Sequence, residues 1–97
     1  MKPPTSSFAY ALRTARKARG VAQEQFDTVS SRTYVSALER GLKQPTIAKV
    51  DALASVLGLH PLTLLALSYK SEPSAADVRR LLARVQQELD ELLGPGT

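Results

Sequence analysis

Residues 23–45 read QEQFDTVSSRTYVSALERGLKQP, and this stretch decides the fold. Apolar residues occur at helical spacing in two short segments, which polar turn residues separate. This pattern predicts one helix beginning near Ala22 and another over residues 31–40. The residues spaced to face inward from these helices are Phe26, Val35 and Leu38. Two short helices joined by a tight turn form the frame that places one helix in the major groove of DNA, so the stretch predicts a helix-turn-helix unit.

Helices are also predicted before and after this unit. One spans residues 7–19, with Ser6 or Ser7 as its cap, and a second runs from Thr46 to Gly58. A third opens at His60-Pro61, because proline suits the first turn of a helix. The apolar residues of these three helices are Phe8, Leu12, Ala15, Ile47, Val50, Leu53, Ala54, Leu57, Leu62, Leu64, Leu65 and Leu67.

A last helix is predicted after the hinge-like SEPS at residues 71–74. Ser74 and Asp77 have the spacing of a capping box, and Gly94-Pro95-Gly96 ends the helix after Leu93. Its apolar residues are spaced as in a short heptad seam, which predicts either a dimer interface or a helix folded back on its own domain. The expected interface residues are Val78, Leu81, Leu82, Val85, Leu89 and Leu92.

Length and composition agree with a small all-α protein. The 97 residues allow one domain of the smaller kind, and the 43% hydrophobic content includes few aromatic residues. No cysteine is present, which excludes a disulfide framework or a thiolate metal site. The start MKPPTSS is not expected to be a secretory signal, and no apolar run approaches the length of a membrane helix. We therefore expect a cytoplasmic protein without a membrane partner.

Charge is unevenly distributed along the chain. Residues 1–70 hold ten Lys and Arg against four Asp and Glu, whereas residues 71–97 hold three against five. A basic body followed by a mildly acidic segment is typical of a polyanion-binding domain with a separate association element. Solvated surface charges would give the same distribution, so charge alone does not decide between the two interpretations.

The region from Leu12 to Leu67 resembles the Cro/C1-type helix-turn-helix regulators, also called the xenobiotic-response-element family. The segments that carry the resemblance are LRTARKARGVAQEQF, SRTYVSALERG, PTIAKVDALASVLG and HPLTLLAL. The resemblance implies a five-helix lambda-repressor-like DNA-binding domain over residues 7–70, after a flexible arm over 1–6 and before a dimerisation helix and tail over 71–97. Two departures are visible: residues 23–39 are about two residues shorter than is usual in such units, and Ala22 stands where Ser or Thr normally caps the helix.

The same resemblance assigns roles to individual residues. A guanidinium can grip O6 and N7 of guanine together, so Arg32 is the foremost candidate for reading a base. Tyr34 and Ser31 have alternative roles, as half-buried packing and as a helix cap. The implied base contacts are Arg32, Thr33, Ser36 and Ala37; the implied phosphate contacts are Gln23, Ser31, Tyr34, Arg40 and Lys43. The resemblance also implies a structural ion pair between Arg16 and Glu39.

No arrangement of residues suggests an enzyme. The single histidine, His60, has no second histidine or cysteine with which to share a metal, and no glycine-rich phosphate loop occurs. We therefore expect no cofactor, no metal and no small-molecule ligand. The sequence favours a transcriptional regulator, and the resemblance to the family implies that it is a repressor. Its expected partners are double-stranded DNA and a second copy of itself. The alternative is a protein-interaction module, such as an antitoxin, whose last helix binds a partner protein.

Overall fold

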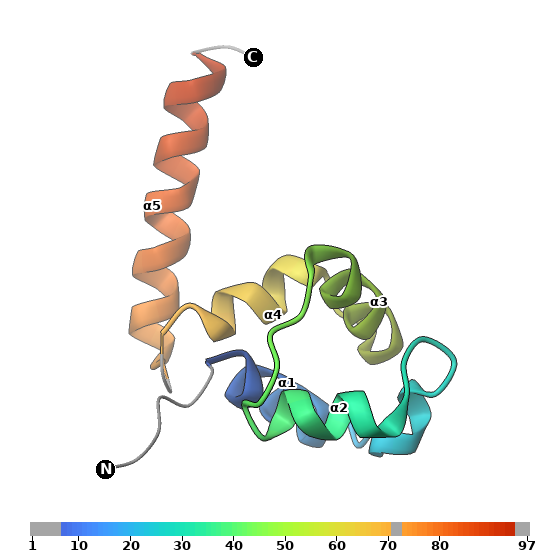
Figure 1. Ribbon diagram of the computed structural model, residues 1–97. Coiled ribbons are helices and arrows are strands. Elements are labelled where there is room, and N and C mark those ends of the chain that lie inside the picture. Colours follow the sequence, from blue (N-terminus) through green and yellow to red (C-terminus); the bar gives the residue numbers. More distant parts are fainter. Residues whose placement is uncertain (1–6, 71–72, 95–97) are drawn as a thin grey trace.

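The computed structural model describes residues 7–70 and 73–94, which form five α-helices and one turn of 3-10 helix (Figure 1). No strand occurs among these residues, which confirms the predicted all-α class. The predicted arm over residues 1–6, with its Ser6 cap, lies outside the described residues, as do residues 71–72 and 95–97. In chain order the elements are α1 Ser7–Ala18, η1 Gln23–Phe26, α2 Arg32–Glu39, α3 Ile47–Leu57, α4 Pro61–Ser68 and α5 Ala75–Leu93.

One hydrophobic core joins all the elements except α5. α1 packs most extensively on α4 and also contacts α2, which places the first and fourth α-helices side by side (Figure 1). A fully buried leucine or phenylalanine contributes on the order of 1.5–3 kcal/mol, so this cluster supplies the main stabilising free energy of the body. Its largest fully buried side chains are Leu12, Phe26, Val35, Leu38, Leu53 and Leu64.

The helix boundaries follow the caps that the sequence supplies. The hydroxyls of Ser31, Thr46 and Ser74 each accept a hydrogen bond from the backbone N–H three residues on, at 3.1 Å in every case. His60 uses its Nδ1 atom in the same way, accepting from the N–H of Leu62 at 3.0 Å. Gly58 ends α3 with a φ of 69°, a conformation in which most other residues would be strained.

The helix predicted near Ala22 is shorter than expected. It is a single 3-10 turn, because Ala22 has no side-chain oxygen to hold the first free N–H groups of an α-helix. Only Gln25 helps from within the turn, accepting from the Ala22 N–H through Oε1 at 2.7 Å. The chain then turns at once, with the N–H groups of Val29 and Ser30 both donating to the Phe26 carbonyl at 2.9 Å. The shortened segment nevertheless keeps Phe26 fully buried.

Two of the apolar residues named for the predicted helices lie at the surface. Ile47 is 81% exposed at the start of α3, and Leu62 is 64% exposed on α4. α4 is apolar on all sides but turns only one side toward the core, so Leu64 alone is buried there. The exposed side of α4 faces the beginning of α5.

α5 extends away from the body (Figure 1). Its main neighbour is α4, and none of its side chains, all of which the structure describes, is buried. Only its first turns meet α4, through hollows shared by Val78, Leu81 and Leu82 with Ala66. Within a single chain, therefore, α5 does not fold back along its length on its own domain.

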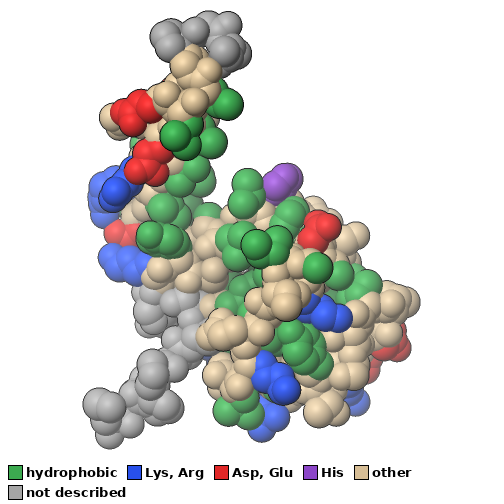
Figure 2. All heavy atoms as spheres, turned by 45° about the horizontal axis from the view of Figure 1, so that its top comes forward, with side chains coloured by type: hydrophobic (Ala, Val, Ile, Leu, Met, Phe, Trp, Pro, Cys, Tyr) green, Lys and Arg blue, Asp and Glu red, His purple; other side chains and the backbone are tan. Residues whose placement is uncertain are grey.

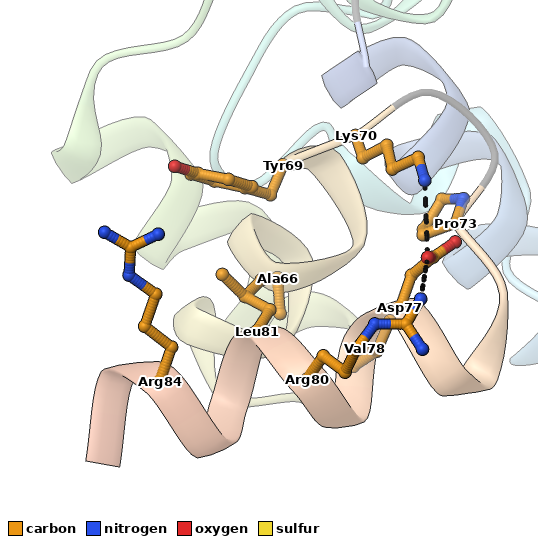
Figure 3. A pocket seen from close by; sticks show the side chains of 9 residues that line it. All are labelled: Ala66, Tyr69, Lys70, Pro73, Asp77, Val78, Arg80, Leu81 and Arg84. Atoms are coloured by element: carbon orange, nitrogen blue, oxygen red, sulfur yellow. Dashed lines mark hydrogen bonds and ion pairs between the residues drawn. The ribbon is translucent and has the colours of Figure 1, made fainter. Parts of the chain in front are cut away.

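The start of α5 leads to a prediction about pH. Hydrogen bonds from the Ser74 N–H and hydroxyl lower the pKa of Asp77 to about 2, together with the nearby Lys70 ammonium, whose contact with Asp77 Figure 3 shows. An unfolded aspartate titrates near pH ~3.9. The ionised carboxylate therefore stabilises the folded cap fully above about pH 4, and this stabilisation is lost as the pH falls through about 2. NMR titration of the Asp77 carboxyl should give a midpoint near 2. The same titration in a Ser74→Ala variant should move toward the ordinary value, and a wild-type midpoint near the unfolded value would contradict the cap.

Candidate nucleic-acid interface

One side of α2 is anchored in the core and the other is open to solvent. Val35 and Leu38 are fully buried, while Arg32 and Thr33 are exposed and Ser36 is half-buried. The Ser31 cap holds the first turn of the helix, which carries the exposed pair. Because its inner side is fixed by packing, the outer side of α2 is presented as a rigid surface.

The exposed side of α2 forms part of a shallow, polar hollow. Five of the residues predicted to contact DNA line it together: Gln23, Arg32, Thr33, Ser36 and Arg40. They come from η1, from α2 and from the residue that caps its C-terminus, so the hollow joins both predicted helices of the helix-turn-helix unit. Two guanidinium groups beside hydroxyls and an amide are donors suited to base edges and phosphate oxygens.

Arg32 is held by an acidic neighbour in the free protein. Its Nη2 atom lies 2.9 Å from Oε1 of Glu24, and the two side chains are 68% and 54% exposed. An ion pair this exposed contributes about 0–1 kcal/mol, whereas a bidentate contact to guanine is worth about 1–3 kcal/mol. Glu24 therefore orients Arg32 without preventing it from exchanging the carboxylate for a base. Sequence reasoning did not identify Glu24, because the spacing of eight residues between the two has no helical signature.

Arg16 and Glu39 form the ion pair that was expected between the first helix and the end of the recognition helix. Glu39 accepts from Arg16 Nε at 2.6 Å and from Nη2 at 3.0 Å. The Glu39 side chain is 5% exposed and the Arg16 side chain 17% exposed. Arg16 also donates to the Val21 carbonyl, at 3.2 Å. The hydrogen bond to Glu39 raises the pKa of Arg16 against the opposing effect of burial. The pair thus ties α1, the segment before η1 and α2 together.

Gln23 is part of this network. Its Nε2 donates to Glu39 Oε1 at 3.0 Å, so the carboxamide is positioned by the buried carboxylate. This holds the side chain where it lines the hollow together with Arg40. A phosphate contact by Gln23 stays a prediction.

Ala37 was expected on the groove-facing side of the recognition helix, and that expectation is wrong. Its side chain is only 6% exposed, because α2 is short and lies close to the body, with Ala37, Leu38 and Glu39 all turned inward at its end. A methyl group with so little accessible surface has nothing to offer a thymine methyl. The predicted set of base contacts is therefore reduced to Arg32, Thr33 and Ser36, and their contacts to DNA stay predictions.

The remaining residues predicted to contact phosphate differ in how they are held. The Ser31 hydroxyl caps α2, and Tyr34 is half-buried against the core, so each fills the structural role that was its alternative. Arg40 is exposed at the C-terminus of α2, where Nε donates to the Ser36 carbonyl at 3.4 Å. Lys43 is exposed in the following turn. Phosphate contacts by these four residues stay predictions.

Lys49 is a residue that helps to hold α2 in place and that sequence reasoning missed. Its Nζ donates to the Val29 carbonyl at 2.8 Å and lies 5.4 Å from the centre of the Tyr34 ring. One ammonium therefore connects α3 to the turn before α2 and to α2 itself. The helical pattern of α3 showed which of its residues face the core, but it could not show that Lys49 meets a carbonyl 20 residues earlier.

We expect Lys49→Met to loosen the turn that sets the position of α2. A hydrogen bond from a charged group contributes about 1.5–3 kcal/mol and a cation–π contact about 0.5–1 kcal/mol, and the partial exposure of Lys49 reduces both. The expected loss is about 1–2 kcal/mol of unfolding free energy, with weaker DNA binding at temperatures where the variant is fully folded. Urea unfolding and fluorescence anisotropy measure the two effects. Lys17→Met, on the exposed part of α1, is the matched control, and equal behaviour of both variants would contradict the role of Lys49.

Comparison with known families identifies the class to which this arrangement belongs. The family model described as Helix-turn-helix matches residues 12–64, which include η1, α2 and most of the core. The chain belongs to this family, the Cro/C1-type helix-turn-helix proteins, and is a DNA-binding regulatory protein by that membership. No curated protein and no solved structure matches the chain.

Among the described residues, no three His, Cys, Asp or Glu side chains are grouped closely enough to hold a metal ion. No single described helix is long and apolar enough to cross a membrane; α3 and α4 reach that length only together, across a bend of 110°.

Proposed function

We propose that the chain is a sequence-specific transcriptional repressor that binds a palindromic operator as a homodimer, with α2 in the major groove. The observation that carries this proposal is the polar hollow on the exposed side of α2, where Arg32 and Arg40 stand at opposite ends of a helix anchored by its buried side. Such a protein would act at the nucleoid, in the cytoplasm. Its occupancy of DNA would follow protein concentration and dimerisation.

In this proposal the side chains divide into two groups. Arg32 reads guanine through paired hydrogen bonds, and Thr33 and Ser36 contact neighbouring base edges. Contacts to phosphate fix the register and orientation of the protein on DNA without reading sequence. The phosphate contacts are Gln23, Ser31, Tyr34, Arg40 and Lys43.

The homodimer rests on α5. Its seam is largely accessible, with Leu82 at 52%, Leu89 at 47% and Leu92 at 82% exposure. Regulators of this kind read two half-sites about 34–36 Å apart, and a two-fold axis in the protein matches the symmetry of a palindromic site. An exposed apolar helix attached to a DNA-binding body is therefore well suited to pair two copies.

A titration against DNA selected from a genomic pool tests the proposal. Specific binding should fall steeply as salt rises, because bound cationic side chains release condensed counterions from the DNA. Arg32→Ala should cost about 1–3 kcal/mol at one base pair and relax the preference there, while Arg40→Ala should weaken all sequences alike. Binding without sequence preference, or without dependence on salt, would contradict the proposal.

A second candidate function is supported by the same helix. If α5 binds a different protein, as in an antitoxin, its apolar seam would be covered by that partner. A small toxin-like reading frame directly beside the gene would favour this function. A chain that is already dimeric when purified alone would favour the homodimer.

A further inference from the structure

An apolar surface continues from α5 onto α4. Leu62 and Leu82 line both of two hollows between the helices: one extends to His60 and Val78, the other to Tyr69 and Val85. Figure 2 shows hydrophobic side chains along one edge of α5 and a second group on the adjoining part of the body. We call this surface the α4–α5 groove. It accompanies only the first half of α5, since α4 ends there (Figure 1).

The second half of α5 also carries apolar side chains, and it extends away from the body (Figure 1). Leu89, Leu92 and Leu93 are 47%, 82% and 65% exposed. We call this half, residues 86–93, the tip. The same helix therefore carries an open apolar groove and an apolar tip. The two lie about 10–15 Å apart along its axis. One copy cannot use its own tip to fill its own groove, because both lie on one straight helix.

Apart from Asp77 in the first turn, the charges of α5 are arranged against the dipole of the helix. Three arginines, Arg79, Arg80 and Arg84, lie in its first half, and three acids, Glu88, Asp90 and Glu91, lie in the tip. Figure 2 shows Asp and Glu side chains toward the free end of α5, and Lys and Arg side chains nearer the body. A helix is stabilised by acids near its N-terminus and by bases near its C-terminus, so this arrangement is unfavourable for α5 alone.

Contacts within the helix compensate only in part for this arrangement. Arg80 pairs with Asp77 at 2.7 Å and Arg84 with Glu88 at 3.3 Å (Figure 3 shows the former). In the tip, Asp90 and Glu91 accept hydrogen bonds from Gln86 and Gln87 at 2.9 and 3.4 Å, and neither forms an ion pair with a described residue. The tip is therefore a negatively charged segment, and the half beside the groove is positively charged.

We propose that the occupant of the α4–α5 groove is the tip of α5 from a second copy of the chain, with the two α5 helices antiparallel. This arrangement places Leu89, Leu92 and Leu93 of each copy against the groove of the other. It also brings the acidic tip of each copy beside the arginines of the other. A parallel pair would instead place arginines beside arginines and acids beside acids. The inference rests on the homodimer proposed above and specifies its geometry and its second contact surface, α4.

The antiparallel pair also positions the two bodies. Because each body is attached at the first half of α5, the bodies lie at opposite ends of the pair, separated along its axis on the order of 20–30 Å. That is the same order as the 34–36 Å between successive major-groove half-sites. A parallel pair would put both bodies at one end, where they would compete for space.

Distances between nitroxide labels in the full-length dimer test the direction of the helices. The chain has no cysteine, so Ala83→Cys and Glu91→Cys each introduce one labelling site. In an antiparallel pair centred near the middle of α5, the labels at position 91 are offset along the axis by about 20 Å and those at position 83 by about 5 Å. A parallel pair puts both sets of labels level. Equal, short distances at the two positions would overturn the antiparallel geometry.

Exchanging charges provides the second arm. Glu88→Lys with Glu91→Lys makes the tip basic and should weaken self-association about tenfold, measured by sedimentation equilibrium at low salt. Adding Arg79→Glu and Arg84→Glu exchanges both halves and should restore it, so this fourfold variant is the matched control. Unchanged association of the basic-tip variant would overturn the charge argument. A wild-type chain that is monomeric would instead contradict the proposed homodimer itself, and with it this inference, whereas a parallel dimer contradicts the inference alone.

Discussion

Replacing Arg16 by methionine is expected to lower the free energy of unfolding by about 3–5 kcal/mol. The change leaves the Glu39 carboxylate, only 5% exposed, without its cation and with a single hydrogen bond from Gln23. A buried charge without a partner has lost its solvation by water, and no attraction to an opposite charge compensates for that loss. Because small domains have stabilities of about 5–15 kcal/mol, the loss is a large share of the total. Urea unfolding measures it.

The double variant Arg16→Met with Glu39→Met is the decisive control. It removes both charges and leaves only apolar side chains of similar length, so it should be more stable than Arg16→Met alone. Glu39→Met should fall between the two, because Arg16 retains the Val21 carbonyl and is 17% exposed. If the effects of the two single changes simply add in the double variant, the pair is not coupled.

Ending the chain at Lys70 is expected to abolish dimerisation and to reduce operator affinity by about 10²–10⁴-fold, since the advantage of joining two binding modules is lost. The body should remain folded, because the core is formed by residues 8–64 and no side chain of α5 is buried. Sedimentation shows the oligomeric state, and anisotropy with a palindromic site shows the affinity. Binding to a single half-site should change little.

A substitution in the full chain separates loss of the helix from loss of the interface. Leu89→Lys places a charge in the exposed seam of α5 and should reproduce the monomer, whereas Ala83→Lys, exposed, outside the seam and in the half that already carries the arginines, should not. Thermal unfolding of the shortened chain checks that the body is intact. A shortened chain that still dimerises and binds the palindrome as tightly as the full chain would show that another surface pairs the copies.

The sequence determined the helices wherever the signal is local. Ser31, Thr46 and Ser74 carry an oxygen one position before a helix, and Gly58 ends α3, so the limits of these elements follow from residues close together in the chain. The side of each helix that packs inward was also predictable for Phe8, Leu12, Val35 and Leu38, since a period of 3.6 residues fixes which side chains share a face. The Arg16–Glu39 pair was reached through family resemblance rather than through spacing.

Only the tertiary structure decided the features that depend on residues far apart in the chain. Ala37 is buried and Ile47 exposed because burial depends on which neighbouring helix covers a position, which helical period alone does not state. The contacts of Lys49 with Val29 and Tyr34 join segments separated by many residues. The hollow on α2 likewise brings together residues that are distant in sequence, Gln23, Arg32 and Arg40. For α5, sequence established an amphipathic helix, and tertiary structure showed that its seam is left open beside a groove on α4, because one straight helix cannot cover itself.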